Sequence, residues 1–275
     1  MMYKYSADVT LIVVCSLVVV VSSGAYTTVQ VPSGPNSTLE RYLCNGSLVS
    51  NGTSLQLEAG EHVISGGLFC SVRNLMDIAI TGAGRDVTVV RCNSGRGFKF
   101  SFIRNLTLAK MAFVGCGLVT TVVPIFVTYP VVLYLEFSSI SMQNIAITDF
   151  IGFGVYGYAL YRSVLEDTQF SNCSGNCSGA VFQGTLGPAT LTVQGCLFTN
   201  LSDQYSTFVA SALNVWYFNL VTVRDCMFYN LSSLFSASAA YVFYSEVNIV
   251  NNTFVSLHGG ALRAYYSIVN IINST

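Results

Sequence analysis

Four phenylalanines recur in one local sequence pattern, and this repeat constrains the fold more than any other feature. Aliphatic residues stand five positions before each of them and seven positions before the last three, and a small polar residue follows two positions later. The phenylalanines are Phe170, Phe198, Phe228 and Phe254, preceded by Leu165, Val193, Val223 and Ile249 and followed by Asn172, Asn200, Asn230 and Ser256. Self-similarity at roughly 20 to 30 residues predicts a solenoid, whose coils bury their apolar faces only by stacking.

Alternation of apolar and polar residues favours β-strands over helices in these units. The segment "LVTVRDCMF", residues 220–228, alternates with a period of two, and no repeat shows sustained helical spacing with caps. Parallel coils about 4.8 Å apart would bring identical positions together. We therefore expect an all-β, right-handed parallel β-helix with phenylalanine stacked inside and asparagine stacked at a turn.

The chain divides into a targeting segment and one domain. Lys4, the apolar run 9–21 and the small residues before Ala25 indicate a secretory signal peptide, residues 1–25, with an uncleaved anchor as the alternative. Residues 26–70 are turn-rich and are expected to form a leader and an N-terminal cap, and residues 71–275 the repeats. Another inner phenylalanine is due just after Thr275. We expect a truncated C-terminus, with a membrane anchor possible beyond it.

Composition raises the question of a membrane. Only 9% of the residues are charged, 52% are hydrophobic, and the formal net charge of −1 gives no electrostatic case for nucleic acid. Residues 117–135 lack charge, but Pro124 and Pro130 would break a helix there twice. Extended β structure fits this segment better, and a transmembrane helix is the alternative.

Cysteine usage agrees with export. Of nine cysteines, Cys15 falls in the signal peptide, which leaves eight in the mature chain, an even number that favours disulfides. The pairing we consider is Cys44 with Cys70, Cys92 with Cys116, Cys173 with Cys177, and Cys196 with Cys226. The last two occupy equivalent repeat positions and should be stacked neighbours, with buried reduced thiols as the alternative to a disulfide.

Ten Asn-x-Ser/Thr sequons support passage through a glycosylating pathway. Three of them, at Asn172, Asn200 and Asn230, coincide with the expected asparagine ladder, and we interpret these amides as structural because an amide facing the core cannot carry a glycan. The glycosylation candidates are Asn36, Asn45, Asn51, Asn105, Asn176 and Asn251.

Two motifs carry a family resemblance. The segment "GGAL" at residues 259–262, with weaker copies "SGAV" and "ASAL", and the "FSN", "FTN" and "FYN" motifs resemble repeats of pectin-lyase-like parallel β-helix proteins, particularly secreted or surface proteins with Gly-Gly-Ala-Ile repeats. The match departs in detail, because the asparagine follows phenylalanine by two residues instead of three and the double glycine is intact once. The resemblance implies the fold more firmly than an activity.

Enzymes of that superfamily use clustered aspartates with calcium and a basic residue, or paired aspartates with a histidine and Arg-x-Lys. Here Glu166 and Asp167 are adjacent, so alternation sends them to opposite faces. Asp167 and Asp225 share a repeat position, but Gly195 separates them, which places the carboxylates about 10 Å apart. His258 is interpreted as a turn residue. We predict no catalytic residue, no metal site and no cofactor, and we interpret Cys173–Cys177 as a disulfide turn rather than a metal site.

One surface feature suggests binding. Trp216, Tyr244 and Tyr265 each stand four residues after an alanine of the repeat, which predicts an outward aromatic ladder for sugar rings or a protein partner. Together these features predict a secreted or cell-surface, non-catalytic β-helix module for adhesion, for binding an extracellular glycan or protein ligand, or for extracellular structure. The alternatives are a polysaccharide lyase or glycoside hydrolase of the pectin-lyase-like superfamily, and a membrane protein.

Overall fold

The structure is a computed structural model. It describes residues 27–34, 38–44, 48–64, 70–92, 97–116, 131–173, 177–185, 188–203 and 210–275. The predicted signal peptide with Cys15, most of the segment 117–135, and the glycosylation candidates Asn36, Asn45 and Asn176 lie outside these residues. Within the described part, no helix has the length and apolarity needed to cross a membrane.

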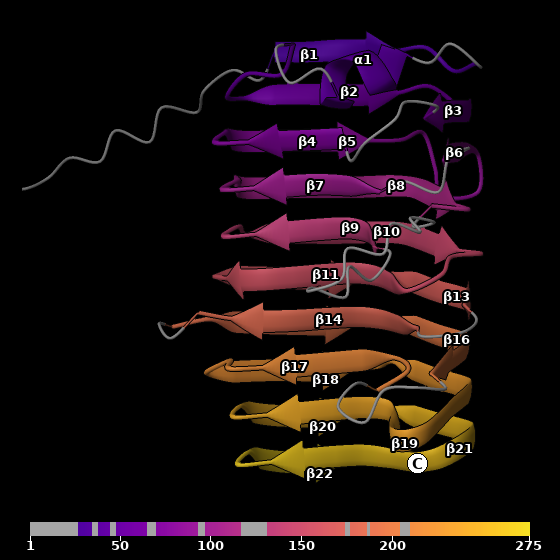
Figure 1. The fold of residues 1–275 in the computed structure, drawn as a ribbon, viewed down its shortest axis with the longest axis vertical. Helices are drawn as coiled ribbons and strands as arrows, with labels where there is room; N and C mark the ends of the chain where they lie inside the picture. The colour runs from indigo at the N-terminus through magenta and orange to yellow at the C-terminus, as the bar shows by residue number, and fades with distance from the viewer. Residues whose placement is uncertain are drawn as a thin grey trace, which may run out of the picture.

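The strands form three parallel sheets that wind into a β-helix (Figure 1). The first sheet contains β1 (Thr27–Val31), β2 (Thr53–Leu57), β5 (Met76–Thr81), the starts of β8 (Arg104–Val114) and β10 (Ile140–Thr148), β12 (Arg162–Glu166), β15 (Thr190–Gln194), β18 (Leu220–Arg224), β20 (Glu246–Val250) and β22 (Ile268–Ile272). The second contains β3 (Gly60–Ile64), β6 (Thr88–Cys92), the ends of β8 and β10, β13 (Gln169–Cys173), β16 (Leu197–Asp203), and the starts of β19 (Met227–Phe243) and β21 (Thr253–Tyr265). The third contains β4 (Cys70–Arg73), β7 (Phe98–Ser101), β9 (Val131–Glu136), β11 (Phe153–Leu160), β14 (Ser178–Gly184), β17 (Leu213–Trp216) and the ends of β19 and β21. The predicted parallel β-helix is confirmed.

The repeated phenylalanines form a column inside the second sheet. Phe170, Phe198, Phe228 and Phe254 pair in register, and each neighbouring pair of rings stacks with centroids 5.0 Å apart. The first three are at most 1% exposed. The spacing of stacked rings matches the spacing of the coils, so the repeat in sequence becomes a continuous core.

Each corner of the helix turns through a residue with positive φ. At the first corner, between the first and second sheets, Lys110, Asn144, Asp167, Gly195 and Asp225 have φ between 48° and 62°. Asparagine and aspartate tolerate this left-handed conformation better than most residues, which explains their enrichment at the corners.

At the second corner, between the second and third sheets, the predicted asparagine ladder is present. Asn230 donates through Nδ2 to Oδ1 of Asn200 at 2.7 Å, Asn200 donates to Asn172 at 3.2 Å, and Asn172 donates to the carboxylate of Asp149 at 3.2 Å. These side chains are exposed, so the expectation that they face the core is wrong. A positive-φ corner directs its side chain outward, and the amides bond along the surface.

The short helix α1 (Thr38–Cys44) lies at the N-terminal end of the stack (Figure 1) and contacts β3 and β4. Its Leu39 and Leu43 are 1% and 2% exposed and pack against the hydrophobic core. The helix thereby covers apolar side chains of the first coils, while the boundaries of a separate cap stay a prediction.

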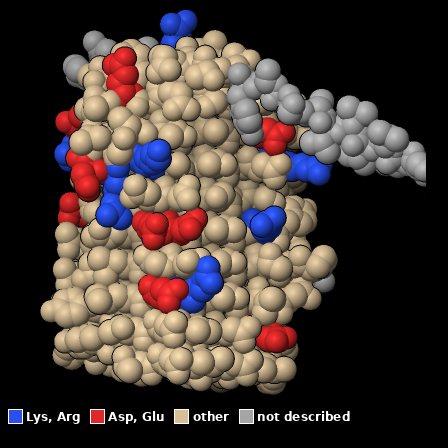
Figure 2. All heavy atoms as spheres, turned by 180° about the vertical axis from the view of Figure 1, so that it is seen from behind, with Lys and Arg blue, Asp and Glu red and all other residues tan. Residues whose placement is uncertain are grey.

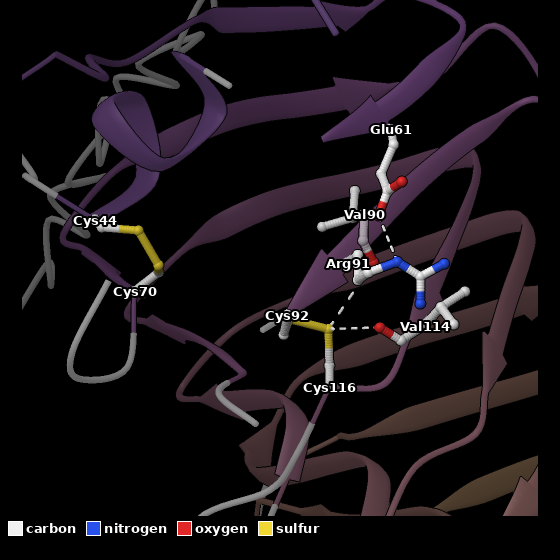
Figure 3. The surroundings of a disulfide bond; sticks show 8 residues. All are labelled: Cys44, Glu61, Cys70, Val90, Arg91, Cys92, Val114 and Cys116. Carbon is white, nitrogen blue, oxygen red and sulfur yellow. Dashed lines mark hydrogen bonds and ion pairs between the residues drawn. A yellow bond between two sulfur atoms is a disulfide. The ribbon is translucent and has the colours of Figure 1, made fainter. Parts of the chain in front are cut away.

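Three disulfides join cysteines in the pairs considered from the sequence: Cys44–Cys70, Cys92–Cys116 and Cys173–Cys177. Figure 3 shows the first two, with the ion pair between Glu61 and Arg91 beside the second. A disulfide between Cys196 and Cys226 is not formed. Both are buried free thiols in adjacent coils, in agreement with the alternative reading of these two residues.

Candidate functional site

A polar groove follows the first corner over the middle coils. It has a volume of about 650 Å³, and the residues of its lining that bear on binding are Arg85, Lys110, Gln143, Asn144, Asp167 and Gly195. Lys110, Asn144, Asp167 and Gly195 belong to one column, because their strands β8, β10, β12 and β15 pair in register. The groove therefore runs along the stack of coils.

Arg85 comes from the loop between β5 and β6. The other described coils have no loop of this length at the first corner. Its guanidinium Nη1 donates to the backbone carbonyl of Asp167 at 3.3 Å, although the two residues are 82 positions apart. It lies 3.9 Å from the exposed carboxylate of Asp86, a loose ion pair that contributes little. The loop thus places a cation across the corner and encloses the hollow.

Lys110 supplies the second cation. It is exposed, and its ammonium has no hydrogen-bond or ion-pair partner among the residues that the structure describes. An exposed ammonium keeps three free donors for a ligand. Lys110 is therefore available to an anionic group that enters the groove.

Asp167 is the carboxylate of the groove. A Cβ atom built on Gly195 in the next coil would lie 2.5 Å from its Oδ1, so the carboxylate extends over the glycine. Gly195 therefore provides the space that Asp167 occupies. The neighbouring Glu166 points away onto the sheet, where it accepts a hydrogen bond from Nε2 of Gln143 at 3.1 Å. The expectation that alternation sends the two acids to opposite faces is wrong, because Leu165 points inward while Glu166 and Asp167 both lie outside. The positive φ of Asp167 at the corner interrupts the alternation.

Charged side chains are unevenly distributed along the solenoid. On the face shown in Figure 2 they gather over the N-terminal and middle coils, and the C-terminal coils are mostly uncharged. The described residues contain no cluster of three or more histidine, cysteine or acidic side chains suited to a metal ion. His258 is exposed in β21 and lies in register with Ser232, far along the stack from the groove.

The predicted aromatic ladder is wrong in its register. Trp216 pairs with Phe243, and Phe243 pairs with Tyr265, whereas Tyr244 belongs to the next column. The counting from alanine fails because Leu213 pairs with Ala240, so Ala240 is not the equivalent of Ala212. β19 also shifts register between Ser232 and Ala240 where it pairs with β21.

The ladder that exists is formed by Tyr217, Tyr244 and Tyr266 at the third corner. Their rings stack with centroids 5.6 Å and 4.8 Å apart and interplanar angles of 8°. Because each ring covers the face of the next, the column does not offer a row of open faces to sugars. Trp216 and Tyr265 are outside this stack, and Trp216 packs with Phe243 against a small buried cluster.

Of the sequon candidates that the structure describes, Asn51, Asn105 and Asn251 are all exposed. Asn105 and Asn251 each donate through Nδ2 to an aspartate in the preceding coil, Asp77 and Asp225. Asn51 instead accepts the backbone N–H of Met76 at 2.8 Å. Glycosylation at these positions stays a prediction.

Sequence reasoning missed Arg85 and Lys110. A signal was present, because Lys110 is the one basic side chain at a corner position filled elsewhere by asparagine, aspartate or glycine. The sequence signal for Arg85 was weaker, since nothing in the segment "GAGRD" indicates that Arg85 contacts a residue 82 positions later.

Comparisons with known proteins place the fold and little else. No protein-family model matches the chain, and no curated protein matches it. Among solved structures, a PL6 family alginate lyase, AlyGC, has a TM-score of 0.53 at 13% identity, covering 92% of this chain and 40% of the lyase. The chain thus spans less than half of the lyase. Pectin methylesterase PemA from Erwinia chrysanthemi has a TM-score of 0.46 at 11% identity, covering 89% of this chain and 90% of the esterase. At such identities the likeness to the lyase shows a shared parallel β-helix fold and nothing about activity.

Proposed function

We propose that the groove at the first corner binds an acidic polysaccharide. The observation that carries the proposal is the presence of two cations, Arg85 and Lys110, against one carboxylate, Asp167, in a polar hollow. Among the lining residues the cations outnumber the carboxylate, whereas the whole chain has a formal net charge of −1. Guanidinium and ammonium groups bind carboxylates through charge-assisted hydrogen bonds, and the amides of Gln143 and Asn144 offer partners for hydroxyls.

Hydrolysis by a pair of carboxylates fits the groove poorly. Asp167 is the acidic residue of its lining, and Glu166 is engaged with Gln143 on the sheet. Asp225, at the same corner, lies two coils away, about 10 Å along the stack. A glycoside hydrolase needs an acid and a second carboxylate that flank one bond. We therefore do not propose this part of the alternative.

The second candidate function is β-elimination on the same polysaccharide. It is favoured by Lys110, whose ammonium is unpartnered in the hollow that also holds Arg85. Elimination at a uronate requires a cation beside the sugar carboxylate, which Lys110 or Arg85 would supply, and a base for the proton next to it, for which the lining offers the carboxylate of Asp167. The proton would pass to that base as the glycosidic bond breaks, and the departing sugar oxygen would take a proton from water. The shared fold with an alginate lyase is compatible with this candidate.

An extracellular location accompanies the proposal. Three disulfides occur within the described residues, and disulfides persist in oxidising compartments. A secreted or cell-surface protein that holds an acidic polysaccharide would serve adhesion or extracellular structure if it does not cleave its ligand.

Binding to alginate and polygalacturonate by calorimetry tests the proposal. Lys110→Ser and Arg85→Ser should each weaken binding about tenfold, the effect of losing one charge-assisted hydrogen bond. Arg73→Ser is the matched control, because Arg73 is exposed at the end of β4 in the third sheet. The proposal fails if neither polymer binds, or if the control weakens binding as much as the groove variants. If the ultraviolet absorbance of unsaturated uronate increases when the protein is incubated with either polymer, the elimination candidate is established. If the absorbance stays constant, the groove binds the polysaccharide without cleaving it.

A further inference from the structure

A second hollow lies on the outer face of the first sheet, at the opposite end of the strands that form the groove. Its volume is about 210 Å³, and its lining includes Asn105, Thr107, Ser141, Arg162 and Val164. Arg162 is the first residue of β12, and Asp167 of the groove follows the last residue of the same strand. β8 and β10 likewise contribute to both hollows.

Arg162 is an exposed cation, as Lys110 is. It is exposed, and its guanidinium has no hydrogen-bond or ion-pair partner among the described residues. The two free cations therefore stand at opposite ends of nearby strands of the first sheet, Lys110 on β8 and Arg162 on β12. β12 has five residues, so the ends are separated by roughly 16 Å.

The surface between the two hollows is a strip of outward side chains. Thr107, Ser141 and Val164 form one column in register, and Ala109, Gln143 and Glu166 form the next. Most of these side chains are short or polar, so the strip leaves a path along the strands. Glu166 is the exception, because it places a negative charge on that path.

We propose that one acidic oligosaccharide lies across this strip, along β8, β10 and β12, with anionic groups at Arg162 and in the groove at the same time. The proposal rests on the proposed function of the groove and adds a second subsite to it. The ligand is then a chain of several linked sugars, because a single sugar cannot reach both cations. Glu166, at the groove end of the strip, disfavours a carboxylate at that point and favours a sugar that presents hydroxyls there.

Calorimetry with size-fractionated oligogalacturonates and oligomannuronates, from monomer upward, tests this arrangement. Affinity should rise with length until the chain spans both hollows and then level off. Arg162→Ser should remove that rise, costing about tenfold for long oligomers and leaving short ones unchanged. Lys110→Ser should weaken oligomers of every length, and Glu166→Gln should strengthen the long ones.

The outcomes separate the two proposals. If binding occurs and depends on Lys110, but Arg162→Ser equals wild type at all lengths, the second subsite is wrong and the groove stands. If no acidic oligomer of any length binds, both are wrong. Circular dichroism of each variant confirms that these exposed substitutions leave the fold intact, with Arg73→Ser as the charge-matched control.

Discussion

The backbone N–H of Cys196 donates to the thiol sulfur of Cys226, one coil further along, at 3.4 Å. The pattern continues, because the N–H of Cys226 donates to Oδ1 of Asn252 at 2.9 Å and that of Asn252 donates to Oγ of Ser274 at 3.1 Å. Cys226 Sγ in turn donates to the carbonyl of Arg224 at 3.1 Å. The two thiols thus hydrogen-bond as hydroxyl groups would and satisfy buried backbone atoms at the first corner. They have this structural role without forming a disulfide.

This role predicts different outcomes for two substitutions of Cys226. Serine retains an acceptor and a donor, so Cys226→Ser should change the free energy of unfolding by less than about 1 kcal/mol. Valine leaves the N–H of Cys196 buried without its partner and should cost about 1–3 kcal/mol. Urea unfolding followed by circular dichroism measures both. Equal losses for serine and valine would contradict the account, since shape alone would then explain the thiol.

The phenylalanine column should dominate the stability of the middle coils. Phe198 is 0% exposed and stacks on both Phe170 and Phe228. Phe198→Ala should cost about 3–5 kcal/mol through lost burial and the remaining cavity. Phe102, which is 53% exposed and stacks on Phe137, provides the control, and its replacement by alanine should cost about 1 kcal/mol. Comparable losses at the two positions in chemical unfolding would show that the inner column is not the main core.

Gly195 should act on the groove through Asp167. In Gly195→Ala the new Cβ would lie 2.5 Å from Oδ1 of Asp167, so the carboxylate must move. Gly115→Ala is a matched control, because Gly115 has a φ of 65° against 62° for Gly195 and nothing within 4 Å of its Cβ position. Both should lose about 1 kcal/mol of stability from the left-handed backbone, while polysaccharide affinity should change only in Gly195→Ala. An identical affinity in both variants would show that Asp167 does not contribute to polysaccharide binding.

Alkaline stability should depend on Tyr134. Burial, followed by the nearby carboxylate of Glu136, raises the pKa of Tyr134 to about 12 from 10.0. An unfolded tyrosine ionises near pH 10, so between about pH 10 and 12 the folded state keeps a proton that the unfolded state has lost. The stability contribution is therefore complete below pH 10 and is lost as the pH rises toward 12.

Unfolding midpoints measured from pH 9 upward for wild type and Tyr134→Phe test this sign. The variant should lose less stability across the alkaline range, and replacement of the exposed Tyr161 by phenylalanine should follow wild type. A steeper alkaline loss in Tyr134→Phe would contradict the assignment.

The sequence predicted the features that repeat in every coil. The phenylalanine column and the asparagine ladder recur at constant offsets from each other, so stacking in parallel coils fixes their neighbours without knowledge of the loops. The direction of the ladder was not predictable in the same way, because the offset does not reveal that Asn172, Asn200 and Asn230 adopt positive φ and point outward.

Features that break the repeat could not be derived. Counting from alanine misplaced Tyr244, because two alanines are adjacent in that coil and the count started from the wrong one. Leu213 and Leu262 both pair with Ala240, so Ala239 is the equivalent of Ala212. The groove depends on Arg85, whose loop occurs in one coil and reaches Asp167 across the stack. Contacts of that kind depend on the three-dimensional path of a single loop, which periodicity does not encode.

A crystal structure of the protein soaked with an acidic oligosaccharide long enough to span the strands of the first sheet tests the central claim most directly. We expect density for the sugar in the groove, with a carboxylate within hydrogen-bond distance of Lys110 or Arg85. Density at the tyrosine stack of Tyr217, Tyr244 and Tyr266 with an empty groove would contradict the proposed function and transfer it to the third corner.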